Sequence, residues 1–317
     1  MTTASLVLVT GGAGFIGSHL VERLLADGHR VRVFDNFSTG RRANLDFARG
    51  HRRLEVVRGE LSSFKAVARA MAGVSTVFHQ AAMRSVPRSV DDPLGANAAN
   101  VTGTLHVLHA AAKQRRKPRV VYASSSSVYG ERPDLPKREE QPVAPISPYA
   151  ATKVAGEIYA SVWHRLFGVE TVGLRYFNVF GPRQDPKSEY AAVIPRFIIW
   201  ALSNTPLEVH GDGTQSRDFT YIDNVVDANL AAAAAPAASG EVFNVGCGDR
   251  VSLLDIIGRL EKILGRAVAR RHTPGRAGDV PHTLADVTKA RTLMHYVPQV
   301  DFDEGFRRTL DYFRRTA

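Results

Sequence analysis

The sequence is poor in cysteine and has no long apolar run. Its 317 residues include a single cysteine, Cys247, which excludes a disulfide framework and predicts a reducing, cytoplasmic location. Cys247 is expected to be a structural turn residue, and no Cys or His spacing indicates a metal site. No segment approaches the roughly 18 apolar residues of a membrane span, so no membrane partner is expected. The N-terminus lacks a positive region and predicts no signal peptide.

Acidic residues are also scarce, since 31 Asp and Glu face 41 Lys and Arg and leave a net charge of +10. Nucleic-acid binding must therefore be weighed, but the basic clusters lie in no nucleic-acid motif and lack interleaved aromatic residues. We interpret them as solvated surfaces that modestly steer an anionic substrate, and expect no nucleic-acid partner. The clusters are 41–42, 49–53, 113–119, 266–276 and 307–315.

The first 175 residues alternate between strand-like and helix-like patterns. This alternation predicts an α/β fold of the Rossmann type, a doubly wound parallel sheet with helices on both faces. The predicted strands are Leu6–Thr10, Val31–Asp35, Leu54–Arg58, Thr76–His79, Arg119–Ala123 and Glu170–Leu174. The predicted helices between them are Phe15–Ala26, Ser63–Met71, Gly95–Lys113 and Tyr149–Phe167.

After about residue 177 the alternation gives way to Pro, Gly and Asp punctuation with isolated helices at Asp223–Ala235, Leu253–Leu264 and Asp303–Arg314. We predict a dinucleotide-binding domain over residues 1–177. A smaller mixed α/β domain over residues 178–317 would bind the substrate, with some exchange of chain between the two.

The stretch Thr10-Gly11-Gly12-Ala13-Gly14-Phe15-Ile16-Gly17 follows the first strand and opens a helix. Its glycines allow a tight turn, a close approach to a pyrophosphate and helix–strand packing, and the helix N-terminus supplies free N–H groups. The next strand ends at Asp35, whose carboxylate suits a ribose 2′-hydroxyl and repels a 2′-phosphate. We therefore predict NAD, with Arg41-Arg42 keeping NADP as the alternative.

Tyr149 and Lys153 are spaced i, i+4 at the start of a helix and share one face. A free tyrosine titrates near pH 10, and a nearby ammonium favours the phenolate. The pair therefore predicts a Tyr149 with a lowered pKa that acts as general base or acid.

Together these motifs resemble the extended short-chain dehydrogenases/reductases of the nucleotide-sugar epimerase kind, over nearly the whole chain. The resemblance also includes His79-Gln80-Ala81-Ala82, Ala123-Ser124-Ser125-Ser126-Ser127-Val128-Tyr129-Gly130 and Arg175-Tyr176-Phe177-Asn178. It places the catalytic hydroxyl on Ser125, four positions before Tyr129, with Ser126 touching the sugar and Ser124 and Ser127 structural. Related dehydratases and decarboxylases carry acidic residues in this run, and their absence here leaves oxidation and re-reduction at one carbon.

The resemblance thus implies a 4-epimerase in which Tyr149 takes the proton of the sugar 4-hydroxyl, Ser125 relays it and Lys153 binds the nicotinamide ribose. The 4-keto sugar then rotates about its diphosphate link before it is reduced again on the opposite face. The implied NAD contacts are Gly11, Gly14, Phe15, Ile16, Gly17, Asp35, Asn36, Ser38, Thr39, Gly40, Glu60, Leu61, Gln80, Ala81, Ala82, Asn100, Tyr149, Lys153 and Phe177. Glu60 departs from the family, which has Asp there.

The implied contacts to a UDP-sugar are Ser85, Arg88, Ser125, Ser126, Tyr149, Asn178, Val193, His210, Arg217, Arg276, Asp279 and Thr283. Hexose-specific relatives carry a bulky Tyr at the position of Thr283, so a small residue there leaves room for an acetamido group. The stretch Ser85-Val86-Pro87-Arg88-Ser89 also resembles UDP-N-acetylglucosamine 4-epimerases.

We therefore expect UDP-N-acetylglucosamine/UDP-N-acetylgalactosamine interconversion, with dual activity on UDP-glucose/UDP-galactose open. A UDP-glucose 4-epimerase, a UDP-glucuronate 4-epimerase and a non-enzymatic NAD sensor remain alternatives. The resemblance also implies a homodimer through the helices that start near Gly95 and Tyr149.

Overall fold

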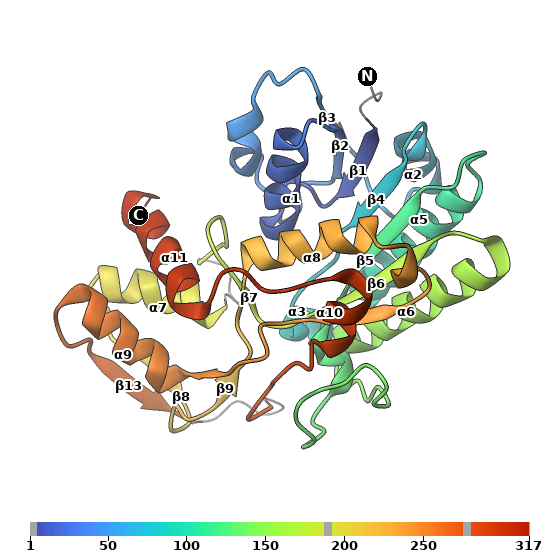
Figure 1. Cartoon of the computed structure of the whole chain (residues 1–317). Helices are drawn as coiled ribbons and strands as arrows, with labels where there is room; N and C mark the ends of the chain where they lie inside the picture. Colours follow the sequence, from blue (N-terminus) through green and yellow to red (C-terminus); the bar gives the residue numbers. More distant parts are fainter. Residues whose placement is uncertain (1–4, 187–191, 275–279, 317) are drawn as a thin grey trace.

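The computed structural model describes residues 5–186, 192–274 and 280–316, and its centre is a parallel sheet of seven strands (Figure 1). The strand order is β11-β6-β5-β4-β1-β2-β3, and every neighbouring pair is parallel. The strands are β1 (Leu6–Thr10), β2 (Arg30–Asp35), β3 (Leu54–Arg58), β4 (Thr76–His79), β5 (Arg119–Ser125), β6 (Thr171–Tyr176) and β11 (Val242–Val245). The sequence predicts the first six to within two residues at each end and misses β11.

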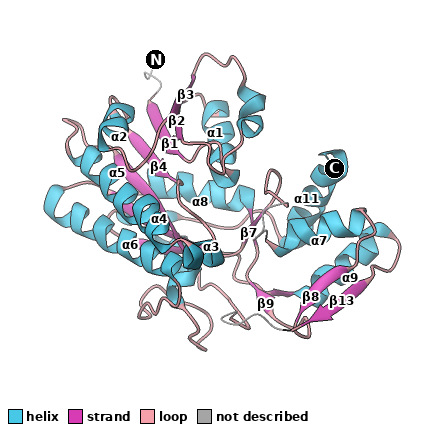
Figure 2. Ribbon diagram, turned by 180° about the vertical axis from the view of Figure 1, so that it is seen from behind, coloured by secondary structure: helices cyan, strands magenta, loops and turns pink. Residues whose placement is uncertain are grey.

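Helices cover both faces of the sheet, as the two ribbon views show (Figure 2). One face packs against α2 (Phe64–Met71), α5 (Gly103–Ala112) and α6 (Pro148–Phe167), and the other against α1 (Phe15–Ala26) and α8 (Ile222–Ala234). Successive strand residues point to opposite faces. In β1, Leu8 packs in the hydrophobic cluster with α2 and α5, whereas Val7 and Val9 pack on the other face in the cluster with α1 and α8. The predicted doubly wound α/β fold is confirmed.

The helix predicted over Gly95–Lys113 is interrupted. Asp92 caps α4 (Pro93–Asn97) by accepting a 2.8 Å bond from the Gly95 N–H, so the helix begins before Gly95. A π-helical turn, η2 (Ala98–Thr102), then leads into α5. Such wide turns often occur at functional sites. This one carries Asn100, whose buried amide bonds to the Met83 N–H at 2.7 Å and to the Thr152 hydroxyl at 3.0 Å.

The second half of the chain builds a smaller group of elements beside the sheet. It contains α7 (Val193–Leu202), α9 (Leu253–Leu264), α10 (Thr288–Met294), α11 (Phe302–Thr316), and the parallel pair β8 (Leu207–His210) and β13 (Arg270–Thr273). It also contains two short strand pairs, the parallel pair β7 (Val179–Phe180) and β10 (Thr220–Tyr221), and the antiparallel pair β9 (Ser216–Arg217) and β12 (Val251–Ser252). Because β11 and α8 return to the main sheet, the division after residue 177 stays a prediction.

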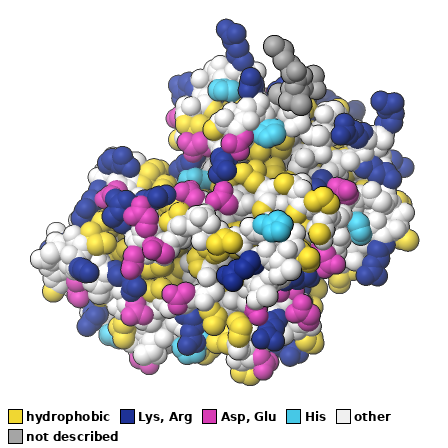
Figure 3. Space-filling model, in the orientation of Figure 1, with side chains coloured by type: hydrophobic (Ala, Val, Ile, Leu, Met, Phe, Trp, Pro, Cys, Tyr) yellow, Lys and Arg dark blue, Asp and Glu magenta, His cyan; other side chains and the backbone are white. Residues whose placement is uncertain are grey.

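Charged side chains of both signs are interspersed over the face seen in Figure 3. Several arginines of the basic clusters are paired with acids, for example Arg307 with Glu304 and Asp311 at 2.9 and 3.0 Å. This agrees with solvated surfaces, and the absence of a nucleic-acid partner stays a prediction. Within the described ranges no helix is both long and apolar enough to cross a membrane.

Candidate functional site

The glycine-rich turn after β1 has no room for side chains at Gly11 or Gly17. Gly11 has φ +67°, and a Cβ there would lie 2.8 Å from the Ala81 backbone. A Cβ on Gly17 would lie 2.2 Å from the Gly11 carbonyl oxygen. Gly14 is the N-cap of α1 and makes no side-chain cap, so this turn and the helix N-terminus present backbone to the adjoining cavity. That arrangement suits a pyrophosphate.

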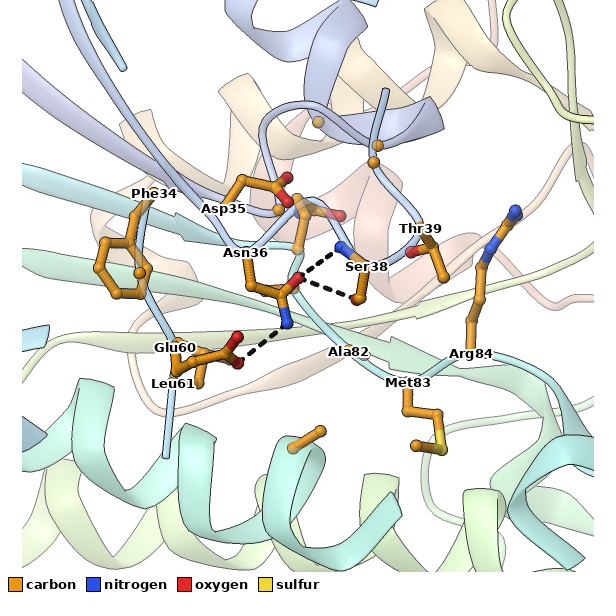
Figure 4. Close-up of a pocket in the computed structure, with 18 of the residues that line it drawn as sticks. Phe34, Asp35, Asn36, Ser38, Thr39, Glu60, Leu61, Ala82, Met83 and Arg84 are labelled. Atoms are coloured by element: carbon orange, nitrogen blue, oxygen red, sulfur yellow. Dashed lines mark hydrogen bonds between the residues drawn. The ribbon is translucent and has the colours of Figure 1, made fainter. Parts of the chain in front are cut away.

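A cavity of about 390 Å³ opens beside this turn, at the carboxyl ends of β1, β2 and β4 (Figure 4). Most of the predicted NAD contacts line it. They are Gly11, Gly14, Phe15, Ile16, Gly17, Asp35, Asn36, Ser38, Thr39, Gly40, Glu60, Leu61, Gln80, Ala81 and Ala82. The predicted contacts Asn100, Tyr149, Lys153 and Phe177 are not among the lining residues, whereas Arg88, predicted for the substrate, is. The lining residues that the sequence motifs did not indicate are Phe34, Gly59, Ser62, Met83, Arg84, Gly95, Ala98 and Ala99.

The end of β2 fits a dinucleotide without a 2′-phosphate. Asp35 is buried in the cavity wall and accepts bonds from the Ala13 and Phe37 N–H groups at 2.9 and 2.8 Å. The two arginines that kept NADP open have other partners, since Arg41 pairs with Asp185 at 2.6 Å and Arg42 lies 4.7 Å over the Phe37 ring. The residues present therefore fit NAD.

Glu60, the departure from the family pattern, has a partner in this wall. The Asn36 amide donates to Glu60 at 3.0 Å and accepts from the Ser38 N–H at 3.0 Å and hydroxyl at 2.8 Å (Figure 4). The longer carboxylate thus fixes Asn36 and Ser38 at the cavity.

The serine run forms the end of β5 and the short helix η3 (Ser126–Tyr129). Ser125 lies where they meet and accepts a 2.9 Å bond from the Ser127 hydroxyl, and its hydroxyl is near enough to the Tyr149 phenol to act on the pKa of that phenol. Ser124 is buried and donates to Glu157 at 2.5 Å. The structure therefore brings Ser125 to Tyr149 and points Ser124 away from them, as the predicted roles require.

The charges around Tyr149 differ from the prediction. Burial raises the pKa of the Tyr149 phenol, while the Ser125 hydroxyl and the charge of Arg84 oppose that rise. Lys153 Nζ lies 5.7 Å from the Tyr149 ring centre and donates to the Ala123 carbonyl at 2.7 Å. The predicted lowering of the Tyr149 pKa was wrong, because burial outweighs the effects that oppose it. One of these is the charge of Arg84, which no sequence motif indicated.

The predicted substrate residues lie on several segments. Ser85 caps α3 (Val86–Asp91), Ser126 lies in η3, exposed Asn178 follows β6 and Val193 begins α7. His210 ends β8 and bonds to the Thr273 hydroxyl at 2.7 Å. Arg276 and Asp279 lie outside the described residues.

Hydrogen bonds between β9 and the segment 281–283 bring Arg217 and Thr283 together. Arg217 in β9 donates to the Pro281 carbonyl at 2.9 Å, and the Thr283 N–H donates to the Ser216 carbonyl at 3.1 Å. Buried Asp218 accepts from Cys247, Gly248 and Ala285 N–H groups at 2.8, 3.0 and 3.1 Å. A single carboxylate therefore ties together the segments that carry Arg217 and Thr283.

His106 and His109 on α5 have structural partners. His106 bonds to the Leu61 carbonyl at 2.7 Å, and His109 packs 5.4 Å from the Phe64 ring. The half-buried Cys247 lies in the turn before Gly248. Among the described residues no cluster of His, Cys, Asp and Glu could hold a metal ion.

Comparison with known proteins gives one consistent result. The model of the NAD dependent epimerase/dehydratase family matches residues 7–246. A UDP-glucose 4-epimerase of Mycolicibacterium smegmatis is 40% identical over 98% of this chain and 99% of its own. The solved UDP-N-acetylglucosamine 4-epimerase of Methanobrevibacter ruminantium, in complex with UDP-N-acetylmuramic acid, is 37% identical with a TM-score of 0.94 over 100% of both chains. The UDP-glucuronic acid 4-epimerase of Bacillus cereus, solved with UDP-glucuronic acid and NAD, is 34% identical with a TM-score of 0.91 over 98% of this chain and 100% of that one.

Proposed function

The chain belongs to the NAD dependent epimerase/dehydratase family, and we propose that it interconverts UDP-N-acetylglucosamine and UDP-N-acetylgalactosamine. The coarser activity, NAD-dependent 4-epimerisation of a UDP-sugar by an isomerase, follows from the family and from the activities named for relatives that span the whole chain. What we propose beyond this activity is a preference for UDP-N-acetylhexosamines over other UDP-sugars.

The observation that carries this preference is the small side chain of Thr283. Its segment pairs with β9, and the Thr283 hydroxyl accepts a 3.4 Å bond from the Asp218 N–H. The side chain is therefore directed toward the protein and not extended as a Tyr would be. A site without that aromatic ring has space for a 2-acetamido group. The likeness to a solved UDP-N-acetylglucosamine 4-epimerase supports the same assignment.

The chemistry assigned to the chain's own residues is proton movement at the sugar 4-hydroxyl. NAD, when bound, supplies the group that accepts and returns the hydride. Tyr149 takes the hydroxyl proton, and Ser125, which lies beside the Tyr149 phenol, contacts the same oxygen and relays the proton. Arg84 and Lys153 provide positive charge in this region, which favours the phenolate. The serine run contributes no carboxylate that could serve as the acid for eliminating water.

A UDP-glucose 4-epimerase is the second candidate, because the 40% identical relative carries that name. The purified protein should be incubated with UDP-N-acetylglucosamine, UDP-glucose and UDP-glucuronate separately, and the C4 epimers separated by chromatography. We expect UDP-N-acetylgalactosamine as the main product. Conversion of UDP-glucose alone contradicts the substrate assignment, and no epimer from any of the three contradicts the enzyme assignment.

The variant Thr283→Tyr tests the stated reason. It should abolish conversion of the N-acetylated sugar and retain conversion of UDP-glucose, since the ring occupies the space of the 2-substituent. Thr283→Val, which keeps the size and removes the hydroxyl, is the matched control and should keep the N-acetylated substrate. Equal use of both sugars by Thr283→Tyr would show that another residue sets the preference.

We further propose that the protein is a homodimer through α3, α4 and α6, which pack side by side (Figure 2). This surface exposes apolar side chains, with Val90 60%, Leu94 82% and Ile158 58% exposed. Solvent contact of such a patch is unfavourable in a monomer. Light scattering of the purified protein measures the mass directly, and a monomer mass at micromolar concentration contradicts the proposal.

A further inference from the structure

A buried ion pair that the proposed chemistry does not use lies directly behind the serine run. Arg175 on β6 donates from Nε to Glu157 Oε1 at 2.9 Å and from Nη2 to Oε2 at 2.8 Å. The two side chains are only 6% and 9% exposed. A forked pair of this kind holds both partners in a defined geometry, and breaking it leaves an uncompensated buried charge.

The pair contacts both ends of the serine run. Glu157 Oε1 also accepts the Ser124 hydroxyl at 2.5 Å, one residue before Ser125. Arg175 Nη1 donates to the Tyr129 hydroxyl at 2.9 Å, and Tyr129 donates in turn to Asn244 Oδ1 of β11 at 2.7 Å. The segment that carries Ser125 is therefore held from behind at two points by one ion pair.

The same carboxylate lies on the helix that carries Lys153. Glu157 follows Lys153 by four residues, so the two side chains share a face of α6. Lys153 Nζ donates to the Ala123 carbonyl of β5 at 2.7 Å, and α6 lies so close to β5 that a Cβ on Gly156 would be 2.2 Å from the Tyr122 hydroxyl. Any change at Glu157 thus acts at the contact between the helix of Tyr149 and the strand of Ser125.

We propose that Glu157 and Arg175 are positioning residues of the epimerase: the pair fixes Ser125 relative to Tyr149 and Lys153, and the Glu157 carboxylate keeps Lys153 in its charged form. This inference rests on the proposed function.

Among the groups that face Lys153, Glu157 is the one that can keep Lys153 in its charged form. Tyr149 and Glu157 face it from α6, the Tyr122 ring lies 5.2 Å from Nζ on β5, and Arg175 on β6 is held by Glu157. His79 on β4 is neutral, because burial and the charge of Lys153 lower its pKa to about 3. Glu157 is the only carboxylate in this set. Burial lowers the pKa of Lys153 to about 8, and the charge of Glu157 opposes that fall.

The variant Glu157→Gln keeps the size and an acceptor for Ser124 and removes the charge. Loss of the Glu157 charge lowers the pKa of Lys153. Because a neighbouring opposite charge shifts a pKa by about one unit or more, the alkaline limb of kcat/KM should move about one pH unit lower. We expect kcat to fall tenfold or more at pH 8, with the KM for the UDP-sugar within twofold of wild type. The titration of ¹³C-labelled Lys153, assigned with Lys153→Met, should move in the same direction and needs no activity.

Two matched variants separate charge from position. Glu157→Asp restores the charge and should return the alkaline limb toward wild type. Ser124→Ala removes the hydroxyl that links Glu157 to the serine run and leaves all charges in place, so kcat should fall with no movement of the limb.

An unchanged Lys153 titration in Glu157→Gln overturns the electrostatic role, and wild-type kcat in Ser124→Ala overturns the positioning role. If Glu157→Gln does not fold, the same measurements on Glu157→Asp and Ser124→Ala decide both points: a Glu157→Asp limb displaced about one unit from wild type contradicts the charge argument. A wild-type protein that epimerises no UDP-sugar contradicts the proposed function instead, and the Lys153 titration still tests the role of Glu157.

Discussion

Replacing Lys153 by Met removes a charge that the fold buries at a cost. Lys153 is 4% exposed, and burial lowers its pKa from 10.5 to about 8. Each pKa unit corresponds to about 1.4 kcal/mol, so holding the ammonium in the folded state costs on the order of 3 kcal/mol near neutral pH. Met loses the hydrogen bond to Ala123, worth about 1 kcal/mol. The variant should therefore be about 2 kcal/mol more stable at pH 7.

The pH dependence of this gain has a definite sign. The folded-state pKa of Lys153 lies below the unfolded-state value, so the folded protein binds the proton less tightly. The cost is full below about pH 8, diminishes between the two pKa values, and vanishes above 10.5, where lysine is neutral in both states. The advantage of Lys153→Met should therefore shrink steadily as the pH rises from 8 to 10.

Thermal unfolding followed by circular dichroism at pH 7 and pH 10 measures both effects. We expect Lys153→Met to unfold a few degrees above wild type at pH 7, to lose most of that margin at pH 10, and to have no epimerase activity. Lys65→Met on the exposed surface of α2 is the control and should leave the midpoint unchanged. An equal or lower midpoint for Lys153→Met at pH 7, or a margin that is the same at both pH values, refutes the reasoning.

Ser125→Ala should lower turnover by about 10²- to 10⁴-fold, the usual contribution of a positioned proton-transfer group, and leave NAD affinity unchanged. Near-normal turnover would mean that another serine of the run acts. Gly17→Ala should abolish NAD binding in isothermal titration, because its Cβ would lie 2.2 Å from the Gly11 carbonyl oxygen. Gly258→Ala on α9, where a Cβ would meet no atom within 4 Å, is the control, and equal affinity in both variants would contradict this account of the turn.

The sequence predicts the alternating part of the fold because those strands read as short apolar runs, and all of them except the edge strand β3 are largely buried on both faces. It misses β11 because Val242–Val245 is a four-residue segment in a part of the chain without alternation, and only its pairing with β6 makes it a strand of the main sheet. No pattern in the sequence indicates the π turn within the predicted Gly95–Lys113 helix. Asn100 in this turn makes tertiary bonds, to Met83 and Thr152, that helical periodicity does not predict.

The candidate site divides in the same way. The glycine turn and Asp35 are predictable because a motif of fixed spacing directly specifies their backbone geometry. Charge effects are not, since spacing says that Tyr149 and Lys153 share a helical face but not what each side chain contacts. The carbonyl of Ala123 and the carboxylate of Glu157 determine the position and charge of Lys153, and Arg84 reaches Tyr149 from a separate loop. The chemistry of this site therefore depends on burial and on contacts between elements, which is why variants of Glu157 and Lys153 test it more sharply than variants of the motif itself.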